Sequence, residues 1–178
     1  IDLISEEALR TAAIEGEYLN RDSIQSSLRQ QLGLGKAERH VPPAERGIAE
    51  MMVDVYLNFP DPLTHTTLFN WHRMLMASDR RIETVGSYRT HTEPMQIVSG
   101  EPGLAEIHFE APPSTRVPAE MDTFLSWFND TAPSGKTPLP PLTRAGLAHL
   151  YFESIHPFED GNGRIGRAIS EKALAQSI

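Results

Sequence analysis

One stretch of twelve residues constrains the fold of this chain more than any other: His156-Pro157-Phe158-Glu159-Asp160-Gly161-Asn162-Gly163-Arg164-Ile165-Gly166-Arg167. Pro157 must end the helix that precedes it, because proline cannot continue a helix. The glycines on either side of Asn162 free the backbone, so that N–H groups can converge on an anion at the start of the next helix. With a histidine, a carboxylate and two arginines, this turn can hold a polyphosphate and transfer part of it.

The two arginines of this stretch are the natural phosphate ligands. Arg164 and Arg167 lie three residues apart, so a helix places them on the same face. Each guanidinium can bind phosphate oxygens as a fork. The chain as a whole has a net charge of −8, which disfavours non-specific binding to nucleic acid or to anionic lipid. We therefore expect a local anion site, and no direct binding of nucleic acid or of a membrane.

The hydrophobic pattern predicts a mainly α-helical chain with one small β-hairpin. The predicted helices run from Ser5 to Glu15, from Asp22 or Ser23 to about Leu32, from Pro43 to before Pro60, from about Leu63 to Ala77, from Pro118 to Asn129, from Leu142 to Ile155 and from about Gly163 onward. Two short alternating runs, 95–98 and 105–109, flank a Gly-Glu-Pro-Gly turn at 100–103 and predict the hairpin. In the helix 142–155, we expect a buried side formed by Leu147, Leu150, Tyr151 and Ile155.

Length and composition fit one ordinary domain. A chain of 178 residues with 39% hydrophobic and 22% charged residues can bury a core and is typical of soluble proteins. No apolar run approaches the roughly 18 residues of a transmembrane helix. The absence of cysteine excludes disulfides and thiolate chemistry and fits a cytoplasmic protein. Because the chain starts at Ile1 and stops within a helical pattern, we interpret it as a piece of a longer protein.

Two other readings of the same region are weaker. The spacing Gly161-x-Gly163-x-x-Gly166 matches a dinucleotide-binding fingerprint, but that motif follows a strand and precedes an acidic residue about 20 positions later. Here a helix precedes it and only 12 residues follow it. His149, Glu153 and His156 share a helix face with a spacing that could bind zinc. A helix face packed in the core explains that spacing more simply.

The stretch from His156 to Arg167 resembles the Fic family signature, His-x-Phe-x-(Asp/Glu)-Gly-Asn-Gly-Arg-x-x-Arg, without departure. The resemblance extends to His149 in the preceding helix, to the hairpin ending in Pro112-Pro113, and to Met121 and Trp127-Phe128-Asn129. It covers roughly 42–178 and implies a Fic core domain, a helical bundle with a hairpin flap beside the active site. Residues 1–41 then form an N-terminal helical region.

This resemblance implies adenylylation, which is transfer of AMP from ATP to a Ser, Thr or Tyr hydroxyl of a target protein with release of pyrophosphate. It assigns His156 as general base and Asp160 as the ligand of Mg²⁺, with Mn²⁺ as an alternative. The remaining implied roles are an anion hole formed by Gly161, Asn162 and Gly163, and β- and γ-phosphate binding by Arg164 and Arg167. The related toxin Doc has lysine in place of Gly163 and transfers a terminal phosphate, so glycine favours nucleotidyl transfer.

Two further elements follow from the same resemblance. Residues 11–16, Thr-Ala-Ala-Ile-Glu-Gly, resemble the inhibitory motif (Ser/Thr)-x-x-x-Glu-(Gly/Asn) of many Fic proteins. This implies an inhibitory helix at about 5–16 in which Glu15 pairs with Arg167 and holds the enzyme in a weakly active state. The flap strand implies docking of the target by strand pairing through Gln96, Ile97, Val98 and Ser99.

Several alternatives stay open at this point. The same fold can remove AMP from a modified protein, with Glu15 orienting water, or can use another nucleotide or phosphodiester donor. The chain could also be a nucleotide-sensing or toxin–antitoxin module without turnover, although pure binding needs no base at His156. Self-modification and a homodimer are further expectations from the family.

Overall fold

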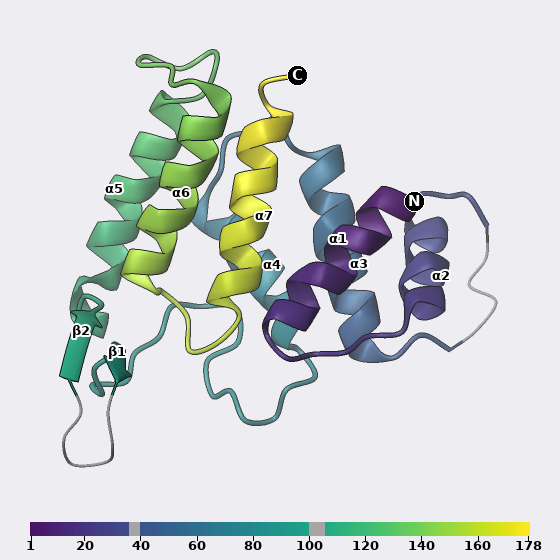
Figure 1. Ribbon diagram of the computed structural model, residues 1–178, viewed down its shortest axis with the longest axis horizontal. Coiled ribbons are helices and arrows are strands. Elements are labelled where there is room, and N and C mark those ends of the chain that lie inside the picture. The colour runs from purple at the N-terminus through teal and green to yellow at the C-terminus, as the bar shows by residue number, and fades with distance from the viewer. Residues whose placement is uncertain (36–39, 100–105) are drawn as a thin grey trace.

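Helices make up most of the chain, and one antiparallel pair of strands follows α4 in the sequence and projects at one end of the molecule, below α5 and α6 (Figure 1). The computed structural model describes residues 1–35, 40–99 and 106–178. In these ranges the elements are α1 (Asp2–Ile14), α2 (Arg21–Gln31), α3 (Pro43–Leu57), α4 (His65–Met76), β1 (Gln96–Ser99), β2 (Glu106–Glu110), a 3-10 turn (Ser114–Arg116), α5 (Val117–Asp130), α6 (Pro141–Ile155) and α7 (Asn162–Ala175). The predicted class, mainly α with one small hairpin, is confirmed.

Helix starts depend on side chains that satisfy the first backbone N–H groups. The side chain of Asn20 accepts a hydrogen bond from the N–H of Ser23 and caps α2, which begins at Arg21, one residue before Asp22. Thr64 caps α4 in the same way. The prediction that the first helix starts at Ser5, with that side chain as its N-cap, was wrong. Helix α1 already begins at Asp2, and Ser5 is buried within it, with its hydroxyl donating to the Asp2 carbonyl.

Helices α5, α6 and α7 pack as one group, and α1 to α4 form the other side of the molecule (Figure 1). Helix α6 packs against both α5 and α7, and α7 also contacts α1, α3 and α4. A close approach joins α3 to α4, because a Cβ atom at Gly47 would lie 1.8 Å from the Met74 carbonyl oxygen. The short loop between α6 and α7 lies near the hairpin, at the same end of the molecule.

The expected buried side of α6 was wrong in part. Leu147 and Leu150 are exposed, and Tyr151 is partly buried. Ile155 is buried as expected, and Ala145, Ala148 and Phe152 complete the inner face. The apolar residues of α6 are spread around its circumference, so their spacing alone did not indicate which side is buried. Helix α7 packs against the side that carries the small residues Ala145 and Ala148, and Leu147 and Leu150 remain exposed on the outside.

Two buried cations bind the carbonyl groups at helix C-termini. Lys172 Nζ donates to the carbonyls of Asn58 (2.6 Å) and Phe59 (3.1 Å), just after α3. Arg144 Nη2 donates to the Phe128 carbonyl at 2.8 Å, near the end of α5. The last carbonyls of a helix lack intrahelical partners and carry the negative end of its dipole. These cations therefore hold the ends of α3 and α5 in place.

The hairpin pairs β1 and β2 in antiparallel register, from Gln96 opposite Glu110 to Ser99 opposite Glu106, with an irregularity between Ile97 and Val98. Every residue of both strands is exposed. The predicted turn at 100–103, and the start of the second run at 105, lie outside the described residues. No helix in the described ranges is long and apolar enough to cross a membrane.

Phe158 anchors the loop between α6 and α7 in an aromatic core, where it is fully buried against Tyr88 and Phe152. We expect Phe158→Ala to lower the free energy of unfolding by about 3–5 kcal/mol, because it leaves a cavity in a packed core. Urea denaturation followed by circular dichroism measures this. Tyr18→Ala is the control, since that aromatic side chain is 90% exposed. A loss as small as that of the control would contradict the anchoring role.

Candidate active site

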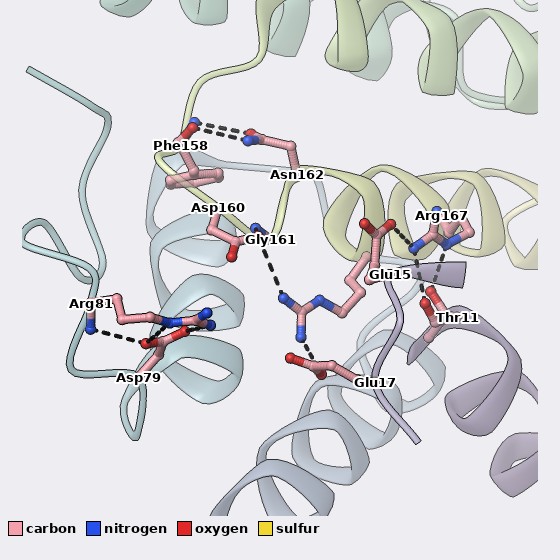
Figure 2. Close-up of polar contacts among 11 residues, drawn as sticks. Thr11, Glu15, Glu17, Asp79, Arg81, Phe158, Asp160, Gly161, Asn162 and Arg167 are labelled. Carbon is pink, nitrogen blue, oxygen red and sulfur yellow. Dashed lines mark hydrogen bonds and ion pairs between the residues drawn. The ribbon is translucent and has the colours of Figure 1, made fainter. Parts of the chain in front are cut away.

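The loop between α6 and α7 is closed by a reciprocal pair of hydrogen bonds (Figure 2). The side-chain oxygen of Asn162 accepts from the Phe158 N–H at 2.9 Å, and its amide nitrogen donates to the Phe158 carbonyl at 2.9 Å. Asn162 is buried, so its side chain is fully used inside the loop. Only its backbone can contribute to the anion hole expected at this position.

The first turn of α7 supplies the backbone donors of this hole. Gly161 has a φ of 80°, in the left-handed region, and is the N-cap of α7. Its carbonyl accepts the Ile165 N–H at 3.0 Å, which is the first bond of the helix. The N–H groups of residues 162–164 therefore form the helix N-terminus, where a phosphate is favoured. These N–H groups lie at the residues where the anion hole is expected.

His156 is the C-cap of α6 and adopts a left-handed conformation, with φ 50° and ψ 61°. Its side chain is 34% exposed, and burial lowers its pKa below the ordinary value. The nearby charge of Arg89 lowers this pKa further, whereas Glu153, Asp160 and Glu15 raise it. Burial outweighs the helix dipole and the carboxylates. Histidine at this position is therefore suited to accept a proton near neutral pH.

A small cavity of about 170 Å³ lies between His156 and the hairpin. It is lined by Met95, Gln96, Ile97, Phe109, Ala111, Glu153 and His156. Of the four residues expected to dock a target, Gln96 and Ile97 line this cavity, and Val98 and Ser99 lie further along the exposed strand. The cavity gives a side chain presented along β1 a route to the histidine.

Both arginines of the motif are paired with carboxylates from the N-terminal segment (Figure 2). Arg167 Nη2 donates to Glu15 Oε1 at 2.6 Å, and its Nε donates to the Thr11 hydroxyl at 2.6 Å. The ion pair expected between Glu15 and Arg167 is therefore present. Arg164 Nη1 donates to Glu17 Oε2 at 2.7 Å, a contact that the sequence analysis did not foresee.

The turn after α1 sets the positions of Glu15 and Glu17 relative to each other. Gly16 has a φ of 79°, its N–H donates to the Ala13 carbonyl, and the Glu17 N–H donates to the Ala12 carbonyl, both at 3.0 Å. These bonds form a Schellman motif, which requires a left-handed residue directly after the helix. Gly16 could have indicated this motif in the sequence. The motif fixes the backbone after α1, and therefore the direction in which the Glu17 side chain leaves relative to that of Glu15.

Gly163 leaves the space that Glu15 occupies. A Cβ atom at Gly163 would lie 2.2 Å from Glu15 Oε1 and 3.2 Å from Arg167 Nη1. A side chain at this position would therefore require the Glu15 carboxylate to shift from its present place beside α7.

Asp160 provides one half-exposed carboxylate beside the arginines. Its Oδ1 accepts the Gly161 N–H at 2.5 Å and lies 3.6 Å from Arg164 Nη2. Within the ranges 1–35, 40–99 and 106–178, no three His, Cys, Asp or Glu side chains form a metal-binding group, and this includes His149, Glu153 and His156. A single accessible carboxylate fits Mg²⁺ that arrives with a nucleotide, because Mg²⁺ is commonly held by one or two carboxylates plus phosphates.

Beneath the loop lies His72, which the sequence analysis did not single out. Its ring stacks on Phe158, with centroids 4.2 Å apart and an interplanar angle of 9°. Its Nδ1 accepts the Gly86 N–H at 2.8 Å, so it is deprotonated at that nitrogen. Burial lowers the pKa of His72 to about 4. The floor of the site is therefore kept uncharged.

This neutral histidine gives the fold a pH dependence. Its pKa falls from 6.5 to about 4 on folding, so the unfolded chain binds a proton between these values and stability is lost as the pH drops. From pH 7 to pH 5 we expect this group to remove about 2 kcal/mol from the free energy of unfolding.

His72→Asn tests this, because the Asn Oδ1 can accept the Gly86 N–H without binding a proton. Urea denaturation at pH 7 and pH 5 should show a smaller loss for the variant than for the wild type. Equal losses in the two proteins would mean that His72 does not titrate in this way.

Two family models match the chain. The model described as the Fic/DOC family matches residues 62–174, more than half of the chain. A second, described as a domain of unknown function (DUF4172), matches residues 1–34.

Curated relatives match shorter parts. A relative from Aquifex aeolicus, named as a probable protein adenylyltransferase, is 35% identical over 39% of this chain and 20% of its own length. Protein adenylyltransferase fic-1 of Caenorhabditis elegans is 31% identical over 33% of this chain and 11% of its own. The matched region spans a fifth or less of these relatives.

Solved structures cover nearly the whole fold. A Fic domain containing signaling protein from Bacteroides thetaiotaomicron matches with a TM-score of 0.71 and 23% identity, over 99% of this chain and 63% of its own. A Fic family protein from Desulfovibrio desulfuricans matches with a TM-score of 0.61 and 27% identity, over 96% of this chain and 47% of its own. The helices and the hairpin thus follow the same architecture as in these proteins.

Proposed function

The chain belongs to the Fic/DOC family, and we propose that it is a protein adenylyltransferase that keeps itself weakly active. One observation carries this proposal most strongly. The loop that begins at His156 leads directly into a helix N-terminus flanked by Arg164 and Arg167, so one short segment offers a base and a polyphosphate site. The names of the matched relatives support the same reaction.

In the proposed reaction, a hydroxyl oxygen of the target attacks the α-phosphorus of ATP. A new P–O bond forms, the bond from the α-phosphorus to the bridging oxygen breaks, and pyrophosphate leaves. The hydroxyl proton passes to the imidazole of His156. A positioned base of this kind contributes on the order of 10²–10⁴ in rate. The cavity beside His156 supports this role, because it lets the hydroxyl approach from the hairpin side.

The N-terminus of α7 would hold the phosphates. Its backbone N–H groups at 162–164 face the charge that develops on phosphate oxygens, and preplaced donors of this type are a large part of catalysis. Arg164 and Arg167 would bind the β- and γ-phosphates. Mg²⁺ held by Asp160 would neutralise charge shared by the α- and β-phosphates.

The hairpin would present the target. Strand β1, Gln96–Ser99, is exposed along its length, so an extended segment of another protein can add to it by main-chain hydrogen bonds. Such pairing depends little on side chains. The proposed target class is therefore an extended segment with a Ser, Thr or Tyr near the point opposite the cavity.

Autoinhibition would act through the two carboxylates of the N-terminal segment. Glu15 engages Arg167 and Glu17 engages Arg164, so the groups that should bind the β- and γ-phosphates are already in ion pairs. ATP would have to bind with its phosphates displaced, which misaligns the α-phosphorus for attack. Weak activity of the intact chain is the result.

Incorporation of label from α-³²P-ATP into protein tests the proposal. With Mg²⁺, we expect strong labelling by Glu15→Gly, weak labelling by the wild type, and none by Glu15→Gly/His156→Ala. The reason is that the first change frees Arg167 and the second removes the base. No labelling by any of the three, with ATP binding intact, would contradict AMP transfer and favour another donor.

Glu17 should add to this effect. In the Glu15→Gly background, Glu17→Gln is expected to raise kcat about threefold to tenfold more, because it frees a nearly buried Arg164 from a charge-assisted hydrogen bond. Glu6→Gln is the matched control, since Glu6 belongs to the same N-terminal segment, on α1, and pairs with Arg10 and Arg21, outside the motif. An equal response to both substitutions would rule out a specific role of Glu17.

A further inference from the structure

Arg89 is a buried cation that the proposed reaction does not use. It lies on the segment between α4 and the hairpin and is only 2% exposed. Among the described residues it forms hydrogen bonds with carbonyl groups and no ion pair with a carboxylate. Burial lowers its pKa. Burying a charged guanidinium is unfavourable, so the contacts of Arg89 must compensate for the loss of water.

Its contacts converge on the backbone of His156. The Nε donates to the His156 carbonyl at 2.7 Å, and one Nη2 contact reaches the Ile155 carbonyl at 3.4 Å. The Arg89 N–H donates to the Pro157 carbonyl at 2.9 Å. Three successive carbonyls, from Ile155 to Pro157, are therefore held by one residue.

A further contact joins the same residue to the hairpin. Arg89 Nη2 donates to the Pro112 carbonyl at 2.6 Å, two residues after β2 ends at Glu110. The flat guanidinium thus bridges the end of the target-docking hairpin and the residue expected to act as base. Lysine, with one donor centre, cannot hold both directions as a fork does.

The backbone at His156 needs such support. Its φ of 50° lies in the left-handed region, which costs a residue other than glycine roughly 1–2 kcal/mol. This conformation decides where the imidazole points, because the Cα–Cβ direction follows the backbone. The hydrogen bond to the His156 carbonyl, at the negative end of α6, can offset that cost.

We propose that Arg89 is a positioning residue for AMP transfer: its guanidinium holds His156 in the left-handed conformation and ties the base to the hairpin that presents the target. The catalytic part of this proposal rests on the proposed function. The physical coupling between Arg89 and His156 can be measured apart from that function.

A charge effect accompanies the positioning. A hydrogen bond to the backbone of Glu153 on α6, and the charges of Asp160 on the following loop and of Glu15 from the N-terminal segment, favour protonated His156. Arg89 opposes them and contributes to keeping the imidazole neutral. Substitution by a neutral residue should therefore change both the geometry and the titration of His156, whereas lysine should change mainly the geometry.

The kinetic test uses Arg89→Gln and Arg89→Lys, each in the Glu15→Gly background. We expect kcat to fall about 100-fold for glutamine and about 10-fold for lysine, as for a base displaced by about 1 Å. KM and Kd for ATP should stay within about twofold, because the phosphate site on α7 is untouched. Arg144→Lys is the control for losing a buried helix-capping arginine, and its kcat per folded molecule should match the parent.

The second readout needs no turnover. The imidazole signal of His156, assigned by its loss in His156→Ala, is titrated by NMR in the parent and in both Arg89 variants. Its midpoint should move to higher pH with glutamine and stay near the parent value with lysine. An unmoved midpoint and an unchanged kcat in folded Arg89→Gln would overturn the proposal. A moved midpoint in a parent that does not transfer AMP would uphold the coupling and reject the proposed function.

Discussion

The site depends on how tightly the loop between α6 and α7 is closed. Phe158 holds one end of the loop in the core, and the side chain of Asn162 binds both polar groups of the Phe158 backbone. Because these bonds span only five residues, α7 must start at once and its N-terminus must face the end of α6. The negative end of α6, which bears His156, is thereby set against the positive end of α7, where phosphate is proposed to bind. Reversing either helix would lose this opposition of charge.

Buried cations bind the negative helix ends, whereas the two arginines of α7 pair with carboxylates of the N-terminal segment. Arg89, Arg144 and Lys172 each donate to carbonyls at or near helix C-termini and are almost fully buried. Their positive charge is balanced by backbone dipoles, so they need no carboxylate partner. The arginines of α7 stand near the opposite, positive helix end, where both are paired with carboxylates and Arg167 also donates to the Thr11 carbonyl at 3.1 Å. Glu15 and Glu17 thus supply anions from within the chain at the positions where phosphates are proposed to bind.

Periodicity was sufficient for most of the helices and for the hairpin, because it specifies local structure. The ion pair of Glu15 with Arg167 joins residues 152 positions apart and was expected only from the family resemblance. The sequence was not sufficient where tertiary packing decides. The exposed side of α6 could not be read from a helix that is apolar all round. Arg89 looked like any surface arginine, and only the fold brings it to carbonyls 66 to 68 residues away in the chain. Glu17 was missed because its direction depends on the turn at Gly16 and not on a pattern of residue types.

The strength of the N-terminal contact is bounded by its exposure. The Glu15–Arg167 pair is about one third exposed on each side, and pairs of this kind contribute roughly 0–1 kcal/mol each. Nucleotide phosphates, with more charge and more acceptors, can compete with such a pair. The ion pair of Glu17 with Arg164 is harder to displace, because the Arg164 side chain is only 6% exposed. The Glu17 carboxylate there compensates for the water that the buried guanidinium has lost. Under the proposed function, a contact with one weak and one stronger ion pair would admit ATP at Arg167 first while Arg164 stays paired with Glu17. The nucleotide would then bind with its α-phosphorus out of line, so inhibition would appear in kcat more than in ATP affinity.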